Sequence, residues 1–96
     1  MQKLSEQEVA QRAAQLTGWS VEGGKLHRQF KFGDFKQAMS FMASAVDSID
    51  KLDHHPEWAN VYNRVTVDLN THDAGGITAK DFELGELLEG LSKRAL

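Results

Sequence analysis

Apolar residues recur at helical spacing in two long stretches of the chain, and each stretch follows a residue that can cap a helix. Ser5 and Glu8 have the spacing of a capping box, and the apolar positions after them predict a helix over Glu6–Leu16. Asp34 precedes a longer apolar stripe, which predicts a second helix over Phe35–Leu52.

A loop and a third helix are predicted in the last quarter of the chain. The segment Thr71–Gly76 has the composition of a loop, in which Gly75 and Gly76 give the backbone freedom. Thr78, followed by Asp81 three residues later, repeats the capping pattern and marks the start of the helix. The apolar content of this helix comes from Phe82, Leu84, Leu87, Leu88 and Leu91.

Alternation of apolar and polar residues predicts a β-hairpin between the first two helices. Its arms are Trp19–Glu22 and Lys25–Lys31, and Gly23 and Gly24 between them suit the positive φ angles of a tight turn. His27 falls on the polar side of the second arm, so we expect it on the exposed face of the hairpin.

A second alternating stretch runs from Ala59 to Leu69. Its period alone predicts one long strand, with Ala59, Val61, Val65, Val67 and Leu69 on one face and polar residues on the other. A break near Tyr62 and Asn63 into two strands is the alternative, because Asn tolerates turn geometry. The helices and antiparallel strands together predict an α+β domain of two layers.

The composition limits what such a domain can do. The 96 residues fit one domain over 1–96, and 11 Lys and Arg against 14 Asp and Glu give a net charge of −3. That charge argues against coating nucleic-acid phosphates. The chain has no Cys, which excludes disulfides, thiolate metal sites and a Cys nucleophile. No apolar stretch is long enough for a membrane span, and no secretory signal is found, so we expect a cytoplasmic protein.

Three of the four His residues lie in two neighbouring loop segments. His54 and His55 follow the second predicted helix in a run of two carboxylates, two imidazoles and the indole of Trp58, and His72 lies beyond the next strand. Imidazoles titrate near neutral pH, so several around one cavity can exchange protons. Pro56 keeps His55 extended, which would splay the two rings apart. A hairpin in the intervening strand would bring His72 back beside them.

Simpler interpretations compete with this one. A His in a loop is most often only solvated, and Asp81 can be explained as the acidic residue of a helix cap. A zinc site is disfavoured, because adjacent His side chains diverge on an extended chain and no HExxH motif is present. Neither Gly-Gly pair belongs to a phosphate-binding loop motif.

The motifs taken jointly resemble the pterin-4a-carbinolamine dehydratase family over essentially the whole chain. The resemblance rests on the segments 50–58, 60–65 and 71–82, and extends to Gly18-Trp19 and to residues 30–35. It implies an α-β-β-α-β-β-α fold with a four-stranded antiparallel sheet and three helices on one face. It therefore favours the broken strand near Tyr62.

The same resemblance implies the reaction and its site. Members of the family remove water from 4a-hydroxytetrahydrobiopterin to give quinonoid dihydropterin, which recycles the cofactor of aromatic amino acid hydroxylases, without a metal or a cofactor of their own. The catalytic histidines correspond to His54 and His72, with His55 as the third member. The resemblance implies that Asp53 orients or polarises an imidazole and that Trp58 forms a wall of the pterin pocket. The full set of substrate-binding residues that it implies is Asp53, Trp58, Thr71, Asp50 and Asp81.

One of these carboxylates departs from the pattern of the family. Many members carry Glu where this chain has Asp50, and the shorter side chain argues against a direct contact with the substrate.

The pterin itself is the expected small-molecule partner, and homodimers or homotetramers are expected from the family. Animal members also serve as a dimerisation partner of a homeodomain transcription factor, so a scaffold module for a transcriptional regulator is the alternative function.

Overall fold

The computed structural model describes residues 2–95 and has the element order α-β-β-α-β-β-α expected from the family. The helices and strands are α1 (Glu6–Gln15), β1 (Ser20–Glu22), β2 (Lys25–Lys31), α2 (Phe35–Leu52), β3 (Glu57–Val61), β4 (Arg64–Leu69) and α3 (Ala79–Arg94), with a single 3₁₀ turn, η1 (His72–Ala74), between β4 and α3. The first two helices therefore begin and end within one residue of the predicted positions, and α3 begins directly after its predicted cap, Thr78. The arm predicted to begin at Trp19 is shorter, because Trp19 is buried outside the strand.

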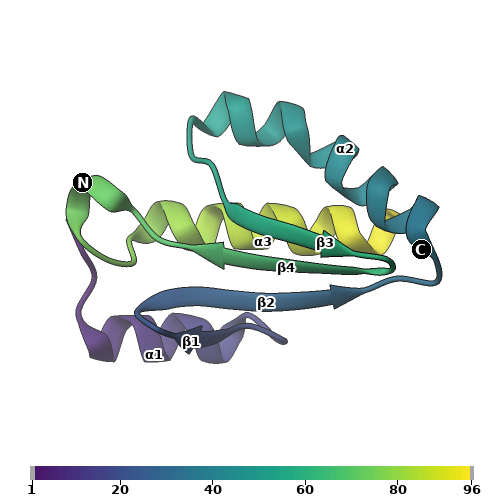
Figure 1. Ribbon diagram of the computed structural model, residues 1–96. Coiled ribbons are helices and arrows are strands. Elements are labelled where there is room, and N and C mark those ends of the chain that lie inside the picture. The colour runs from purple at the N-terminus through teal and green to yellow at the C-terminus, as the bar shows by residue number, and fades with distance from the viewer. Residues whose placement is uncertain (1, 96) are drawn as a thin grey trace.

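The four strands form one antiparallel sheet in the order β1-β2-β4-β3. The two hairpins meet along β2 and β4, where Phe30 lies opposite Val65 and Leu26 opposite Leu69. In Figure 1, α3 lies between α1 and α2 across the width of the sheet. The predicted α+β architecture is confirmed.

The prediction of one unbroken strand over 59–69 is wrong, because the chain turns at Tyr62 and Asn63. Asn60 lies opposite Val65 and Trp58 opposite Val67, so the even positions of β3 share a face with the odd positions of β4. Ala59 and Val61 consequently point to the open face and are exposed, whereas Val65, Val67 and Leu69 are buried. Tyr62 has a φ of 53°, a left-handed conformation that places the reversal at this residue.

The core lies between one face of the sheet and the helices. The strands contribute Leu26, Phe30, Val65, Val67 and Leu69, and the helices contribute mainly Ala38, Phe41, Ala45, Ile49, Leu84 and Leu88. Burial of this apolar surface is the main force that holds the helices on the sheet. No helix within residues 2–95 is both long and apolar enough to cross a membrane.

The caps predicted from sequence form at all three helices. The Ser5 and Thr78 side chains each belong to a complete capping box, and the Asp34 side chain accepts a hydrogen bond from the Gln37 amide. At the other end of α2, Asp53 takes a left-handed conformation with a φ of 52°. This residue ends the helix and turns the chain so that His54 points back towards α3.

Candidate functional site

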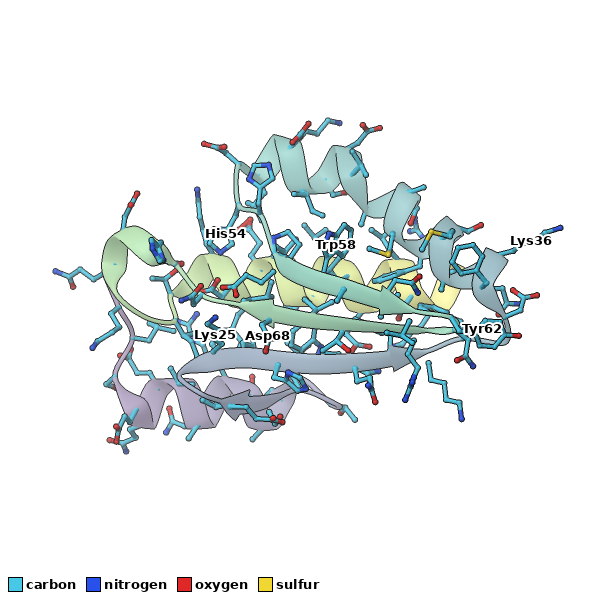
Figure 2. The ribbon with its side chains drawn as sticks, in the orientation of Figure 1. Lys25, Lys36, His54, Trp58, Tyr62 and Asp68 are labelled. Atoms are coloured by element: carbon cyan, nitrogen blue, oxygen red, sulfur yellow. The ribbon has the colours of Figure 1, made fainter. Side chains whose placement is uncertain are left out.

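A buried pair between His54 and Asp81 lies where the end of α2 meets the start of α3. His54 Nε2 lies 2.5 Å from Asp81 Oδ1, and the Asp81 side chain is fully buried. The His54 amide donates to the Ile49 carbonyl oxygen at 3.3 Å, which fixes the backbone behind the ring. Figure 2 shows His54 near the junction of α2 and β3, at the end of the molecule far from Tyr62.

The other oxygen of Asp81 is also fully engaged. Oδ2 accepts a hydrogen bond from the Thr78 amide at 2.8 Å and one from the Thr71 hydroxyl at 3.0 Å. Asp81 therefore caps α3 and binds His54 at the same time. A carboxylate offers only acceptors, so the hydrogen between Asp81 and His54 belongs to the imidazole, which fixes the tautomer with N–H at Nε2.

The second nitrogen of the His54 ring is left for chemistry. No hydrogen-bond partner for Nδ1 occurs among residues 2–95, and no buried side-chain nitrogen or oxygen of that range lacks a partner. Nδ1 therefore reaches the surface, although only 10% of the side chain is exposed. An imidazole anchored at one nitrogen and open at the other can donate or accept a proton.

His55 lies on the outside of the same segment. Its Nε2 is 3.1 Å from Asp50 Oδ1, and the two side chains are 60% and 74% exposed. The expected divergence of the two neighbouring imidazoles is confirmed, because His54 turns inwards and His55 outwards. Asp50, in the last turn of α2, therefore contacts His55 in the segment that follows the helix.

The segment that carries His72 is connected to His54 through Thr71. The Thr71 hydroxyl donates to Asp81, and its backbone pairs with Gly76 across the loop. His72 itself opens the 3₁₀ turn η1 and is exposed. The residue before His72 thus shares a carboxylate with His54, which places the two histidine-bearing segments beside each other.

Trp58 and Asp53 complete the set of residues predicted for the site. Trp58 is half-buried on the helix side of β3, where it packs against the core, and Figure 2 shows it near the junction of α2 and β3. Asp53 is exposed, and its carboxylate makes no hydrogen bond to another side chain within residues 2–95. The carboxylate that orients His54 is Asp81, from a different helix.

A second His–Asp pair lies on the open face of the sheet. His27 Nδ1 is 2.8 Å from Asp68 Oδ1, directly across β2 and β4. Beside it, the hydrogen bond from Lys25 to Glu57 at 2.8 Å raises the pKa of Lys25 above its usual value. Figure 2 shows Lys25 and Asp68 in this region. Within residues 2–95 no group of three or more His, Asp and Glu side chains is arranged to hold a metal ion.

Comparison with known proteins identifies the family of this chain. The profile of the family described as Pterin 4 alpha carbinolamine dehydratase matches residues 2–91. The chain belongs to the pterin-4a-carbinolamine dehydratase family. A protein of Solibacter usitatus named pterin-4-alpha-carbinolamine dehydratase is 54% identical over 90 residues, which cover 94% of this chain and 95% of the relative. A relative of the same name from Opitutus terrae is 50% identical over 90 residues, with 93% of each chain covered.

A solved structure of the family has the same fold. The crystal structure of a transcriptional coactivator/pterin dehydratase from Brucella melitensis superposes with a TM-score of 0.90 at 41% identity, covering 94% of this chain and 98% of the other. The prediction that the chain is a member of a dehydratase family is therefore confirmed.

The sequence predicted Thr78 only as the N-cap of the third helix, but the structure also shows it in contact with Thr71. Thr78 is fully buried, and its hydroxyl lies 2.6 Å from the Thr71 hydroxyl, which in turn donates to Asp81. The capping pattern identified Thr78 as the start of a helix. It gave no sign of the contact with Thr71, because that contact depends on how the loop folds back.

Proposed function

We propose that this protein dehydrates 4a-hydroxytetrahydrobiopterin to quinonoid dihydropterin by proton transfer between histidines and the pterin ring. Carbon 4a loses its hydroxyl group, and the adjacent ring nitrogen loses its hydrogen. A proton must reach the leaving oxygen as the C–O bond breaks, and a second proton must leave the nitrogen as the C=N bond forms. Water and the quinonoid ring are the products, so no oxidant or reductant is needed.

The observation that supports this proposal best is the geometry of His54 beside Asp81. With Nε2–H held by the carboxylate, His54 as an imidazolium would deliver the Nδ1 proton to the leaving hydroxyl. His72, on the segment joined to Asp81 through Thr71, would accept the proton from the ring nitrogen. His55, paired with Asp50, would be the third imidazole of the site.

The remaining site residues would hold the pterin. Trp58 would provide a flat apolar wall for the bicyclic ring. Asp53 is exposed beside His54, where its carboxylate would bind or polarise a polar edge of the substrate. Thr71 donates to Asp81, so in this proposal its contribution to the ring edge comes from the backbone of the loop. Asp81 would act on the substrate only through His54, since its carboxylate is buried.

A dehydration assay tests the proposal. Freshly generated 4a-hydroxytetrahydrobiopterin would be followed with wild type, His54→Ala and His72→Ala, after subtraction of the uncatalysed rate. We expect each variant to lose about 10²-fold or more in kcat, the usual worth of a placed acid or base. His27→Ala is the matched control, because it removes an imidazole that also contacts an Asp, but on the open face of the sheet. Full activity of the His54→Ala/His72→Ala double variant would contradict the proposal.

A second function is favoured by the description of the Brucella structure as both a transcriptional coactivator and a pterin dehydratase. A surface that binds a regulatory protein would need exposed apolar residues, and Phe35 and Val46 of α2 and Leu87 of α3 are 47%, 50% and 40% exposed. The same residues would serve a homodimer or a homotetramer. Size-exclusion chromatography with light scattering on wild type and Val46→Glu would test self-association, with dehydratase activity as the readout for an intact fold.

Finally, we propose that the dehydratase acts in the cytoplasm in tetrahydrobiopterin recycling, after an aromatic amino acid hydroxylase. The enzyme that supplies a 4a-hydroxylated pterin must divide O2 between two molecules, so that one oxygen atom becomes the 4a-hydroxyl group of the pterin and the other becomes the new hydroxyl group of the amino acid. A cell lacking this dehydratase should accumulate the 4a-hydroxylated pterin when such a hydroxylase is active, and complementation with His54→Ala should not reverse the accumulation.

A further inference from the structure

We infer that Thr78 is a positioning residue of the proton-transfer site, and that its hydroxyl holds the two histidine-bearing segments in register. This inference deepens the proposed dehydratase function and depends on it for the activity arm of its test. Thr78 has no predicted role beyond capping α3, yet its side chain is fully buried beside Thr71 and Asp81.

The hydrogen bonds around Thr78 run in one direction. The Thr71 hydroxyl has a single hydrogen and donates it to Asp81 Oδ2 at 3.0 Å. The contact of 2.6 Å between the Thr71 and Thr78 hydroxyls therefore has Thr78 as the donor. The Thr78 oxygen in turn accepts from the Lys80 amide at 3.3 Å. The chain of donors thus begins at the backbone of α3 and ends on Asp81.

Two consequences follow for the histidines. Asp81 binds His54 Nε2, so any rotation of its carboxylate moves the imidazole. Thr71 immediately precedes His72, so the bond from Thr78 also fixes the start of the loop that carries the second imidazole. The bond lies out of bulk water at the centre of this arrangement, and a buried hydrogen bond of this kind restricts its partners to one geometry.

A Thr78→Val variant removes the hydroxyl while keeping the shape of the side chain. The Thr71 hydroxyl then loses its donor and the Lys80 amide loses its acceptor, whereas the bond from the residue 78 amide to Asp81 remains. We expect kcat to fall about 10-fold or more with little change in KM. Losses of this size are usual when a hydrogen-bond partner that orients a functional side chain is removed, as in the outer shell of metal sites. Thr78→Ser restores the hydroxyl and should return kcat to within about threefold of wild type.

Ser5→Ala supplies a matched control for the loss of a helix cap. Ser5 is the N-cap of α1 in a complete capping box, like Thr78 in α3, but it is exposed and belongs to another helix. The Ser5→Ala variant should be less stable to heat, because it loses the side chain that caps α1. Its kcat should stay within about twofold of the wild-type value.

A spectroscopic readout separates this inference from the proposed activity. The Nε2–H proton of His54 should give a downfield NMR signal in the wild type because it is bonded to a carboxylate at 2.5 Å. That signal should shift or broaden in Thr78→Val and return in Thr78→Ser, even if the wild type proved inactive on the pterin. Thr78→Ala removes the same hydroxyl but leaves the bond from Thr71 to Asp81 in place, so it replaces Thr78→Val if the latter does not fold.

The outcomes decide the matter in either direction. A fall in kcat and a changed His54 signal in Thr78→Val, both reversed in Thr78→Ser, would support the inference. An unchanged His54 signal in folded Thr78→Val, equal impairment of Thr78→Ser, or an equal loss of kcat in Ser5→Ala would overturn it. An inactive wild type with a Thr78-dependent His54 signal would refute the proposed function alone.

Discussion

Asp81 binds His54 through one carboxylate oxygen and caps its own helix through the other. Oδ1 lies 2.5 Å from His54 Nε2, while Oδ2 accepts the Thr78 amide at 2.8 Å. The cap is a local contact within four residues, and the contact with His54 joins residues 27 positions apart. The geometry of the imidazole is therefore fixed by the capped start of α3.

Replacing the carboxylate of Asp81 by an amide should separate these roles. In Asp81→Asn one of the two oxygens becomes an NH₂ group, so either the cap is lost or His54 must accept at Nε2 and carry its hydrogen at Nδ1, the opposite tautomer. We expect a loss of about 10²-fold in kcat and of about 1–3 kcal/mol in the free energy of unfolding. Steady-state kinetics and urea titration measure the two effects. A variant with wild-type kcat would contradict the role of Asp81.

The exposed pair of His55 and Asp50 should contribute little to stability. Both side chains are more than half exposed, and such pairs are worth about 0–1 kcal/mol because water screens them. A double-mutant cycle with Asp50→Ala and His55→Ala should give a coupling energy below about 1 kcal/mol. A larger coupling would show that the pair holds the α2–β3 loop. In the dehydration assay, His55→Ala should be impaired and Asp50→Ala less so.

Asp53 offers a test of stability against function. Its φ of 52° at the end of α2 suits glycine, so Asp53→Gly should raise the free energy of unfolding by about 0.5–1 kcal/mol. If its carboxylate serves the substrate as proposed, the same variant should show a raised KM or a lower kcat. Greater stability with unchanged kinetics would remove Asp53 from the site.

The pH dependence of stability should reveal the cap of α1. The pKa of Glu8 is lowered below the usual 4.5 by hydrogen bonds with Ser5. The bond from the Ser5 backbone has the larger effect, and the bond with the Ser5 side chain has the smaller one. A lowered pKa in the folded state means that ionised Glu8 stabilises the fold above its unfolded pKa, and that this stability disappears as the pH falls through the folded pKa. Wild type should therefore lose its advantage over Glu8→Gln in acid. A difference independent of pH would contradict this expectation.

The helices were predictable from sequence because their signals are local. Ser5, Asp34 and Thr78 each precede an apolar stripe of helical period, and each caps its helix in the structure. The turn at Tyr62 was not predictable from the period of the sequence, because a turn of two residues preserves the alternation of apolar and polar residues. The turn does change which positions face the core, so Asn60 rather than Val61 lies opposite Val65. The turn geometry that Asn tolerates left a break open as the alternative, and the family resemblance favoured it.

The sequence predicted a set of site residues but not the contacts among them. The run from Asp50 to Trp58 identified the histidines and carboxylates, and Asp53, the nearest acid in sequence, was the expected partner of an imidazole. The partner of His54 is Asp81, which the tertiary packing of α2 and α3 brings within hydrogen-bond distance. Sequence spacing carries no information on such a contact, since it depends on how two helices meet on the sheet.

The most direct test of the account asks whether one ligand meets both histidine segments. The imidazole signals of the protein, labelled at its histidines, would be followed by NMR during titration with 7,8-dihydrobiopterin, a stable reduced pterin without the 4a-hydroxyl group. We expect His54 and His72 to shift together along one binding curve, while His27, on the open face of the sheet, stays unchanged. A shift of His54 with no change at His72 would contradict a shared site for proton transfer.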